Sequence, residues 1–394
     1  MNKLAIVISH PVQYYSPLFK MLAEVCELKV FYTFGKNGYL SNYDNGFKKV
    51  IDWDIPLLSG YDFQFMDNSA KNPSLNSFWG IKNEQLNHEI KKFNPKAILI
   101  YGWSYYSHLK LMRHFKGNIP IWFRGDSTLL DKSNPLKILL RKFLLSWVYR
   151  FTDLALYVGT ANKSYFKTFG LSDNQLVFVP HTVDNERFAE DQLSKSKKVR
   201  LDLNIPSDNI LILFAGKFER KKNPEILLNA FTEINNKSID LLFVGNGELE
   251  DKLKMQAIAY NSKLERNHIH FIDFKNQSEM PGIYQACDIF CLPSQGPAET
   301  WGLAINEAMA AGKAIICSDK VGCYQDLVEI DKNGWVFRSG DELALKNIIC
   351  KLPEENLFKM GENSKNQIKN WNYKRAVEIL CKTLEQKTFL YFNG

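Results

Sequence analysis

The chain has 394 residues, of which 45% are hydrophobic and 24% are charged, and this length predicts two or three domains. The composition is typical of a globular protein with a large core, and a formal net charge of +7 does not by itself indicate nucleic-acid binding. No apolar run approaches the roughly 20 residues that span a bilayer, and the first run, residues 4–8, is too short for a signal peptide. We therefore expect neither export nor membrane spanning.

The seven cysteines are scattered, and most of them lie inside apolar stretches, as Cys291 and Cys317 do. An odd number of buried thiols is typical of a reducing compartment and not of a disulfide framework. No close cysteine pair has a second pair to complete a zinc site. We expect a cytoplasmic protein with free thiols and no structural metal.

Short apolar runs alternate with helix-length amphipathic stretches along the whole chain. Such runs are typical of parallel strands that are covered on both faces. The expected strands of the first half are residues 4–9, 29–34, 97–102, 120–125, 154–159 and 176–181. Those of the second half are residues 210–216, 240–245, 269–273, 288–293, 314–319 and 334–337. The alternation predicts an α/β fold of two doubly wound parallel-sheet domains.

Three further segments bear on the domain organisation. Residues 35–83 are rich in Asn, Gly, Ser and Asp, and we expect a long binding excursion of the first domain without a sheet element. The polar residues 185–209 are the best candidate for a linker, although a surface helix and loop fits them equally well. A helix is expected over residues 373–386.

Polar side chains follow several strands of the first half, at the edge where doubly wound sheets bind ligands. His10 and Gln13 follow the first strand, and Trp103 follows the third. Arg124 and Asp126 follow the fourth, where an arginine could stabilise a developing negative charge and a carboxylate could act as a general base. The alternatives are a capping role for His10, a helix N-cap at Asp126 and a core position for Trp103.

The stretch at residues 134–150 alternates apolar residues with Lys and Arg. Two interpretations stay open: a helix on an anionic membrane surface, and an ordinary domain helix that buries its apolar face. Asp52-Trp53-Asp54 spells the D-x-D of metal-dependent transferases, but it lies in the irregular excursion, and we interpret it as a chance match.

A glycine turn follows the first strand of the second half. Gly216 is followed closely by the basic residues Lys217, Arg220 and Lys222, which could neutralise a diphosphate; a solvated basic turn is the alternative. After the next strand, the segment Gly245-Asn246-Gly247 allows a close approach of the backbone to a ligand.

The segment at residues 293–312 combines a Pro/Gly/Ser loop with an apolar helix, which is expected over residues 301–311 and which Gly312 ends. Glu307 is a carboxylate in a helix that should be buried, where it needs a partner or a ligand such as two ribose hydroxyls. Glu299 precedes the helix, where free backbone N–H groups are expected at Thr300–Leu303, including Gly302, and favour an anion such as a diphosphate. On chemistry alone, dipole complementation by Glu299 and a protein partner for Glu307 fit equally well.

The spacing Glu299-x(7)-Glu307, inside P-S-x-x-x-x-E-x-W-G-x-x-x-x-E-A-M-A-x-G, closely resembles the donor-site motif of retaining glycosyltransferases of family 4. The resemblance covers roughly residues 176–372, with Lys217 at a position where that family usually has Arg. It implies a GT-B fold, in which two Rossmann-like domains face each other across a cleft. The implied domains are residues 1–190 on the acceptor side and 191–372 on the donor side, with residues 373–394 crossing back to the first domain.

The resemblance implies the transfer of a sugar, with retention, from a nucleoside diphosphate sugar to an acceptor hydroxyl, in surface polysaccharide or glycolipid assembly. Glu307 would bind the ribose and Glu299 the sugar, beside the reacting bond. No cofactor or metal is expected, and the expected partners are the donor, a sugar or lipid-linked acceptor and the inner face of an anionic membrane, with no nucleic acid. The alternatives are a nucleotide-sugar epimerase and a non-catalytic homologue that acts as a partner subunit.

Overall fold

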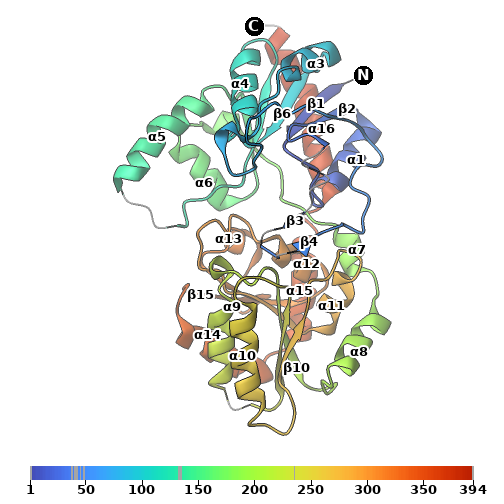
Figure 1. Cartoon of the computed structure of the whole chain (residues 1–394), viewed down its shortest axis with the longest axis vertical. Helices are drawn as coiled ribbons and strands as arrows, with labels where there is room; N and C mark the ends of the chain where they lie inside the picture. Colours follow the sequence, from blue (N-terminus) through green and yellow to red (C-terminus); the bar gives the residue numbers. More distant parts are fainter. Residues whose placement is uncertain are drawn as a thin grey trace. The chain divides into compact units, whose positions relative to one another are not determined.

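The computed structural model describes residues 2–36, 39, 43, 44, 46, 47, 49–131, 135–234 and 236–392. The chain divides into two compact units: unit 1 comprises residues 1–42, 55–181 and 373–394, and unit 2 comprises residues 43–54 and 182–372 (Figure 1). The main boundary therefore lies at His181–Thr182 and not at residue 190. Residues 43–54, which were expected in the first domain, belong to unit 2.

Unit 1 is built on a seven-stranded sheet in the order β5-β2-β1-β6-β7-β8-β9, and every pair in it is parallel. Its strands are β1 (Lys3–Ile8), β2 (Glu27–Tyr32), β5 (Asp62–Phe65), β6 (Ala97–Tyr101), β7 (Ile121–Arg124), β8 (Leu154–Tyr157) and β9 (Leu176–Phe178). The expectation of no sheet element within residues 35–83 was wrong, because β5 pairs with β2 as an edge strand. Only four residues long and without a continuous apolar run, β5 lacks the signal of a central strand.

Unit 2 contains a six-stranded parallel sheet in the order β12-β11-β10-β13-β14-β15. Its strands are β10 (Ile210–Ala215), β11 (Ile239–Val244), β12 (Ile269–Ile272), β13 (Ile289–Leu292), β14 (Ala314–Ser318) and β15 (Gly334–Phe337). All six agree with the predicted strands. A separate antiparallel pair, β3 (Tyr43–Asp44) and β4 (Lys49–Val50), completes the strands of unit 2.

Helices flank both sheets (Figure 1). Those of unit 1 are α1 (Ser16–Val25), α3 (Leu86–Phe93), α4 (Tyr106–Phe115), α5 (Pro135–Tyr149), α6 (Thr160–Thr168) and α16 (Tyr373–Phe392). Those of unit 2 are α7 (Asn185–Ala189), α8 (Leu193–Asp202), α9 (Pro224–Thr232), α10 (Glu250–Asn261), α11 (Met280–Ala286), α12 (Leu303–Ala310), α13 (Tyr324–Leu327), α14 (Glu342–Lys351) and α15 (Leu357–Ile368). None of the described helices is both long and apolar enough to cross a membrane.

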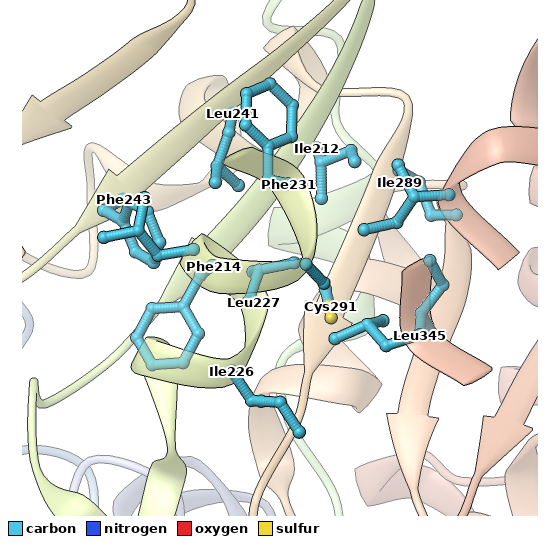
Figure 2. Packing of buried hydrophobic residues seen from close by; sticks show 14 of the residues in the cluster. Ile212, Phe214, Ile226, Leu227, Phe231, Leu241, Phe243, Ile289, Cys291 and Leu345 are labelled. Carbon is cyan, nitrogen blue, oxygen red and sulfur yellow. The ribbon is translucent and has the colours of Figure 1, made fainter. Parts of the chain in front are cut away.

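One face of the unit 2 sheet packs on α9 and α14. A cluster of buried side chains fills this interface (Figure 2). The strands contribute Ile212, Phe214, Phe243 and Cys291, and α14 contributes Leu345. These side chains are fully buried. Burial of apolar area at about 25 cal/mol per Å² stabilises the sheet and thereby fixes the loops at its carboxyl edge.

The segment at residues 185–209 is not a free linker. Its helix α8 packs on α11, and α7 packs on α12. The Arg200 guanidinium bonds the Asp288 carboxylate at 2.7 Å and the Ala286 carbonyl oxygen at 2.7 Å. At the other end of the chain, α16 packs on α1 within unit 1, and its residues Ala376 and Leu380 are buried in the core of that unit.

Candidate functional site

Three loops meet at the carboxyl edge of the unit 2 sheet, where β10, β11 and β13 end. The Phe218 amide donates to the Asn246 carbonyl oxygen at 2.9 Å. The Gln295 amide donates to the Lys221 carbonyl oxygen at 2.8 Å, and its side chain donates to the Arg220 carbonyl oxygen at 2.7 Å. These bonds satisfy backbone groups that the sheet leaves unpaired, so the three loops form one surface.

The glycines of these loops serve the packing of backbone on backbone. A Cβ at Gly245 would lie 2.1 Å from the Gly216 carbonyl oxygen, and one at Gly247 would lie 2.5 Å from the Phe218 carbonyl oxygen. The missing side chains of these glycines thus allow the β10 and β11 loops to pack together. The expected close approach of a ligand to the same glycines stays a prediction.

Lys222 and Glu299 form the central ion pair of this edge. Lys222 Nζ lies 2.7 Å from Glu299 Oε2, and the two side chains are only 17% and 9% exposed. Ser294 Oγ donates to the same oxygen at 3.1 Å. Burial would raise the pKa of Glu299, but the Lys222 ammonium and these hydrogen bonds outweigh it, so the pKa lies below its ordinary value. Glu299 is therefore a fixed carboxylate anion.

The other basic residues of the turn do not converge on Glu299. Lys217 Nζ lies 2.8 Å from Asp44 Oδ1, and the Arg220 side chain is exposed. Lys221 pairs with Glu219 at 3.4 Å. The turn thus presents cations to the edge at several points, with Lys222 the most deeply placed of them.

The helix α12 begins at Leu303, directly after Gly302, whose φ of 93° is left-handed. A Cβ on Gly302 would lie 2.6 Å from Val321 Cγ1, so this turn requires glycine. The helix is two residues shorter at its start than the expected 301–311, because the left-handed turn precedes it. The start of α12, where the first amides of a helix have no intrahelical acceptor, therefore follows the loop that contains Glu299.

Glu307 lies on α12 and is 4% exposed. The Tyr284 hydroxyl donates to Glu307 Oε2 at 2.8 Å, so this carboxylate has a protein partner. The neighbouring Asn306 accepts a hydrogen bond from Trp301 Nε1 at 2.9 Å. Both polar residues of the helix are therefore bonded within unit 2, which makes their burial tolerable.

Asn246 joins four groups of unit 2. Its side-chain amide donates to Glu250 and Asp273 at 3.1 and 3.2 Å. Its oxygen accepts from the Phe274 amide at 2.9 Å and from Lys49 Nζ at 3.1 Å. Asn246 thus fixes the ends of β11 and β12 to each other, and its predicted contact with a donor stays a prediction.

Sequence reasoning missed three residues of this edge: Asp44, Tyr284 and Ser294. Ser294 stands in the same motif, five positions before Glu299, so its position beside Glu299 could have been noticed. Tyr284 and Asp44 are 23 and 173 positions from their partners Glu307 and Lys217. No local pattern marks pairs so far apart in the chain.

The carboxyl edge of the unit 1 sheet has a different character. Arg124, at the end of β7, is 3% exposed and donates from Nη1 to the Val179 carbonyl oxygen and from Nη2 to the Pro180 carbonyl oxygen, both at 3.0 Å. These two bonds fix Arg124 to the chain after β9, and its predicted role toward a developing phosphate charge stays a prediction. Asp126 lies half-buried in the next loop, and its role as a base stays a prediction.

The acceptor-side candidates occupy three separate positions in unit 1. His10 bonds Ser9 Oγ at 2.9 Å, and burial lowers its pKa. Gln13 lies half-buried in the turn between β1 and α1. Trp103 packs against the hydrophobic cluster on one face of the sheet, which agrees with the core position left open for it.

Two buried histidines near this edge are held neutral. His181 is stacked on Tyr15 with ring centroids 5.8 Å apart, and burial, followed by the Arg124 charge, lowers its pKa well below 6.5. His108 bonds Thr33 Oγ1 at 2.8 Å and the Gly102 carbonyl oxygen at 2.9 Å, and burial lowers its pKa to about 4. Neither histidine stood among the predicted site residues.

Residues 195–372 match the profile of the family Glycosyl transferases group 1. The chain is similar to D-inositol 3-phosphate glycosyltransferase of Corynebacterium jeikeium, with 26% identity over 220 residues that cover 53% of this chain and 51% of that protein. It is also similar to phosphatidyl-myo-inositol mannosyltransferase of Mycobacterium tuberculosis, with 31% identity over 146 residues that cover 36% of this chain and 35% of the relative. The chain thus spans about half or less of the length of these curated relatives.

Among solved structures, Anabaena Alr3699/HepE in complex with UDP superposes with a TM-score of 0.71 and 17% identity, over 98% of this chain and 100% of that one. This likeness confirms the predicted fold class, the GT-B type with two Rossmann-like parallel-sheet domains. Both glutamates and the basic turn lie within the part of the chain that matches the family profile.

Proposed function

We propose that the protein is a glycosyltransferase that moves a sugar from a nucleoside diphosphate sugar to an acceptor hydroxyl, with retention at the anomeric carbon. The observation that carries this proposal is the buried Lys222–Glu299 ion pair beside the first turn of α12. Both residues lie in the segment that matches the glycosyltransferase profile. Cations and the amides at a helix N-terminus are the groups that bind a diphosphate, and this edge carries Lys222 and the start of α12.

Each residue of the edge has a proposed part in the reaction. Lys217, Arg220 and Lys222 neutralise the leaving diphosphate, and no metal is needed for that charge. Glu307 accepts hydrogen bonds from the donor ribose while Tyr284 holds it in position. Glu299, kept ionised by Lys222, accepts hydrogen bonds from the sugar and positions it. In unit 1, Asp126 is proposed as the base that takes the proton of the acceptor hydroxyl.

The test is product analysis after incubation with nucleoside diphosphate sugars, with and without acceptor hydroxyl compounds. The proposal predicts an acceptor-dependent glycoside and free nucleoside diphosphate, and NMR of the product should show the anomeric configuration of the donor. Epimerised donor formed without acceptor would support a nucleotide-sugar epimerase instead. Tight nucleotide binding without any turnover would support a non-catalytic partner subunit.

We further propose that unit 1 contacts an anionic membrane surface through α5, at the cytoplasmic face, where a lipid-linked acceptor would lie. Leu145, Val148 and Tyr149 anchor α5 in the core, but Leu140 and Phe143 are 72% and 71% exposed. An apolar helix face open to solvent is a feature of interfacial helices. The relative that acts on phosphatidyl-myo-inositol is consistent with a lipid acceptor.

The charges near the end of α5 fit this surface. A hollow there is lined by Asn87, Lys110, Arg113, His114, Trp147, Arg150 and Phe151. Among the described residues none of its basic side chains pairs with a carboxylate, and Arg113 lies over the Trp147 ring at 5.8 Å. Each such cation near an anionic surface contributes about 1 kcal/mol of attraction.

Co-sedimentation with vesicles tests the membrane contact. We expect binding to phosphatidylcholine vesicles that contain phosphatidylglycerol, weaker binding at high salt, and little binding to pure phosphatidylcholine. Phe143→Ser should weaken the binding. Phe358→Ser is the matched control, because Phe358 is 80% exposed on α15 of unit 2; equal losses in both variants would contradict the assignment to α5.

A further inference from the structure

A strap of unit 2, residues 43–54, comes from a distant part of the sequence. Residues on both sides of it in the chain belong to unit 1. The strap forms the antiparallel pair of β3 and β4, and its contacts within unit 2 fall on residues of the proposed donor site. None of these contacts was expected from the sequence.

Asp44 bonds the basic turn. Its Oδ1 and Oδ2 lie 2.8 and 2.9 Å from Lys217 Nζ. Oδ1 also accepts the amides of Gly46 and Phe47 at 2.8 and 3.0 Å. The Asp44 carboxylate thus already pairs with Lys217, which is one of the cations proposed to neutralise the donor diphosphate.

The rest of the strap covers the loops after β11 and β12. Phe47 packs on Phe274 with ring centroids 4.8 Å apart, and Trp53 packs on the same ring at 6.2 Å. Lys49 Nζ donates to Asn246 Oδ1 at 3.1 Å. These contacts place strap side chains against the residues that follow the two strands.

The end of the strap is fixed by polar contacts. Asn276 Nδ2 donates to the Asp52 carbonyl oxygen at 2.6 Å. The Ser278 amide donates to Asp54 Oδ2 at 3.1 Å, and the Ser278 hydroxyl donates to the same oxygen. The D-x-D segment therefore anchors the end of the strap on unit 2, through the Asp52 carbonyl oxygen and the Asp54 carboxylate.

We propose that the strap closes the phosphate subsite of the donor site. The Asp44 carboxylate occupies the position beside Lys217 where a phosphate oxygen would bind. Donor binding displaces Asp44 from Lys217. The proposal rests on the proposed function. A carboxylate and a phosphate oxygen are both anions, and one ammonium that serves both must exchange them. The donor must break the Asp44–Lys217 contact, so the strap lowers the affinity for anions until it opens.

The size of the effect follows from the exposure of the pair. Both side chains are 30% exposed, and pairs near the surface contribute about 1 kcal/mol or less. Removing the Asp44 carboxylate should therefore increase the affinity for pyrophosphate and nucleotides by about fivefold. The effect should be present for pyrophosphate as well as for nucleotides, because it concerns the phosphates and not the base.

Calorimetry on Asp44→Asn tests the strap with pyrophosphate, UDP, GDP and ADP as probes. We expect Asp44→Asn to bind pyrophosphate and the preferred nucleotide about fivefold more tightly than the wild type. Asp62→Asn is the control for the change in net charge, because Asp62 is an exposed carboxylate of unit 1. The Asp62→Asn variant should bind pyrophosphate and the preferred nucleotide with wild-type affinity. Lys217→Met should bind both probes more weakly than the wild type, since it loses the cation itself.

Hydrogen exchange of the peptide over residues 43–54 provides a second measurement that does not depend on a variant. The preferred nucleotide should speed exchange in this peptide, because a displaced strap loses its contacts with Phe274, Asn276 and Ser278. Unchanged or weaker binding by Asp44→Asn, or slower exchange with nucleotide, would overturn the strap while leaving the proposed function intact. If the wild type binds none of the probes, the proposed function fails together with the strap.

Discussion

The two parallel sheets end in edges of the same kind, yet their charged residues are used differently. In unit 2, Lys222 Nζ lies 2.7 Å from Glu299 Oε2. A ligand could bind to both of these side chains. In unit 1, Arg124 donates to the carbonyl oxygens of Val179 and Pro180. One edge holds charged groups against each other, and the other uses its buried cation to fix the backbone.

This difference indicates which edge can exchange partners. An ion pair between side chains can open and bind a charged ligand without leaving a backbone group unsatisfied. A guanidinium that satisfies two carbonyl oxygens of the chain cannot leave without exposing both. The position of a charged residue at the carboxyl end of a strand therefore does not by itself assign it to chemistry.

The largest expected effect comes from Arg124→Met. Two charge-assisted hydrogen bonds contribute about 1.5–3 kcal/mol each, so the free energy of unfolding, measured with urea, should fall by about 4 kcal/mol. Arg150→Met is the control, because Arg150 is exposed and its loss should change stability little. A stable Arg124→Met protein that binds nucleotide but has lost all turnover would instead support the predicted role of Arg124 toward the developing phosphate charge.

Acid should destabilise the protein through His108. Its pKa is about 4 in the folded state and 6.5 in the unfolded chain, so the unfolded chain binds the proton first as the pH falls. Stability should therefore drop between pH 6.5 and 4, by up to about 3 kcal/mol from this residue.

The measurement is urea unfolding at several pH values. His108→Asn should be less stable at pH 7 but should lose less stability in acid than the wild type. His88→Gln, at an exposed histidine, should keep the wild-type slope. If the slopes of the wild type and His108→Asn coincide, His108 is not held neutral by burial.

Breaking the ion pair of unit 2 should cost less than breaking the backbone contacts of unit 1. Lys222→Met leaves Glu299 buried without its cation, which costs 3–5 kcal/mol for a fully buried pair. Because Lys222 is 17% exposed, we expect about 2–3 kcal/mol at pH 7. The double variant Lys222→Met/Glu299→Gln should recover most of this loss, and thermal unfolding measures both.

The cost of Lys222→Met should depend on pH. In the wild type the pKa of Glu299 lies below 4.5, so the pair stabilises the protein above that pH, and its contribution is lost as the pH falls through the folded pKa. In the variant, burial without Lys222 raises this pKa, so the cost of the substitution should shrink when acid protonates Glu299. A cost that is constant with pH would contradict the charge of Glu299 as its cause.

The sequence predicted the central strands well because buried parallel strands are continuous apolar runs, as at residues 210–215 and 289–292. It failed for β5, whose Asp62–Phe65 lacks that pattern. The Glu299 and Glu307 loop and helix were predictable because their motif is local. Asp44 on Lys217 and Tyr284 on Glu307 were not, since long-range packing alone brings such residues together.

The central claim is that the carboxyl edge of unit 2 binds a nucleoside diphosphate. Its most direct test is calorimetry of UDP, GDP and ADP binding to the wild type and to Glu307→Gln. Glu329→Gln is the control, because Glu329 is exposed in the wild type. We predict that the wild type binds at least one of the three, that Glu329→Gln binds it equally well, and that Glu307→Gln binds it at least tenfold more weakly, a loss of about 1.4 kcal/mol. Equal affinity of Glu307→Gln and the wild type would contradict the account.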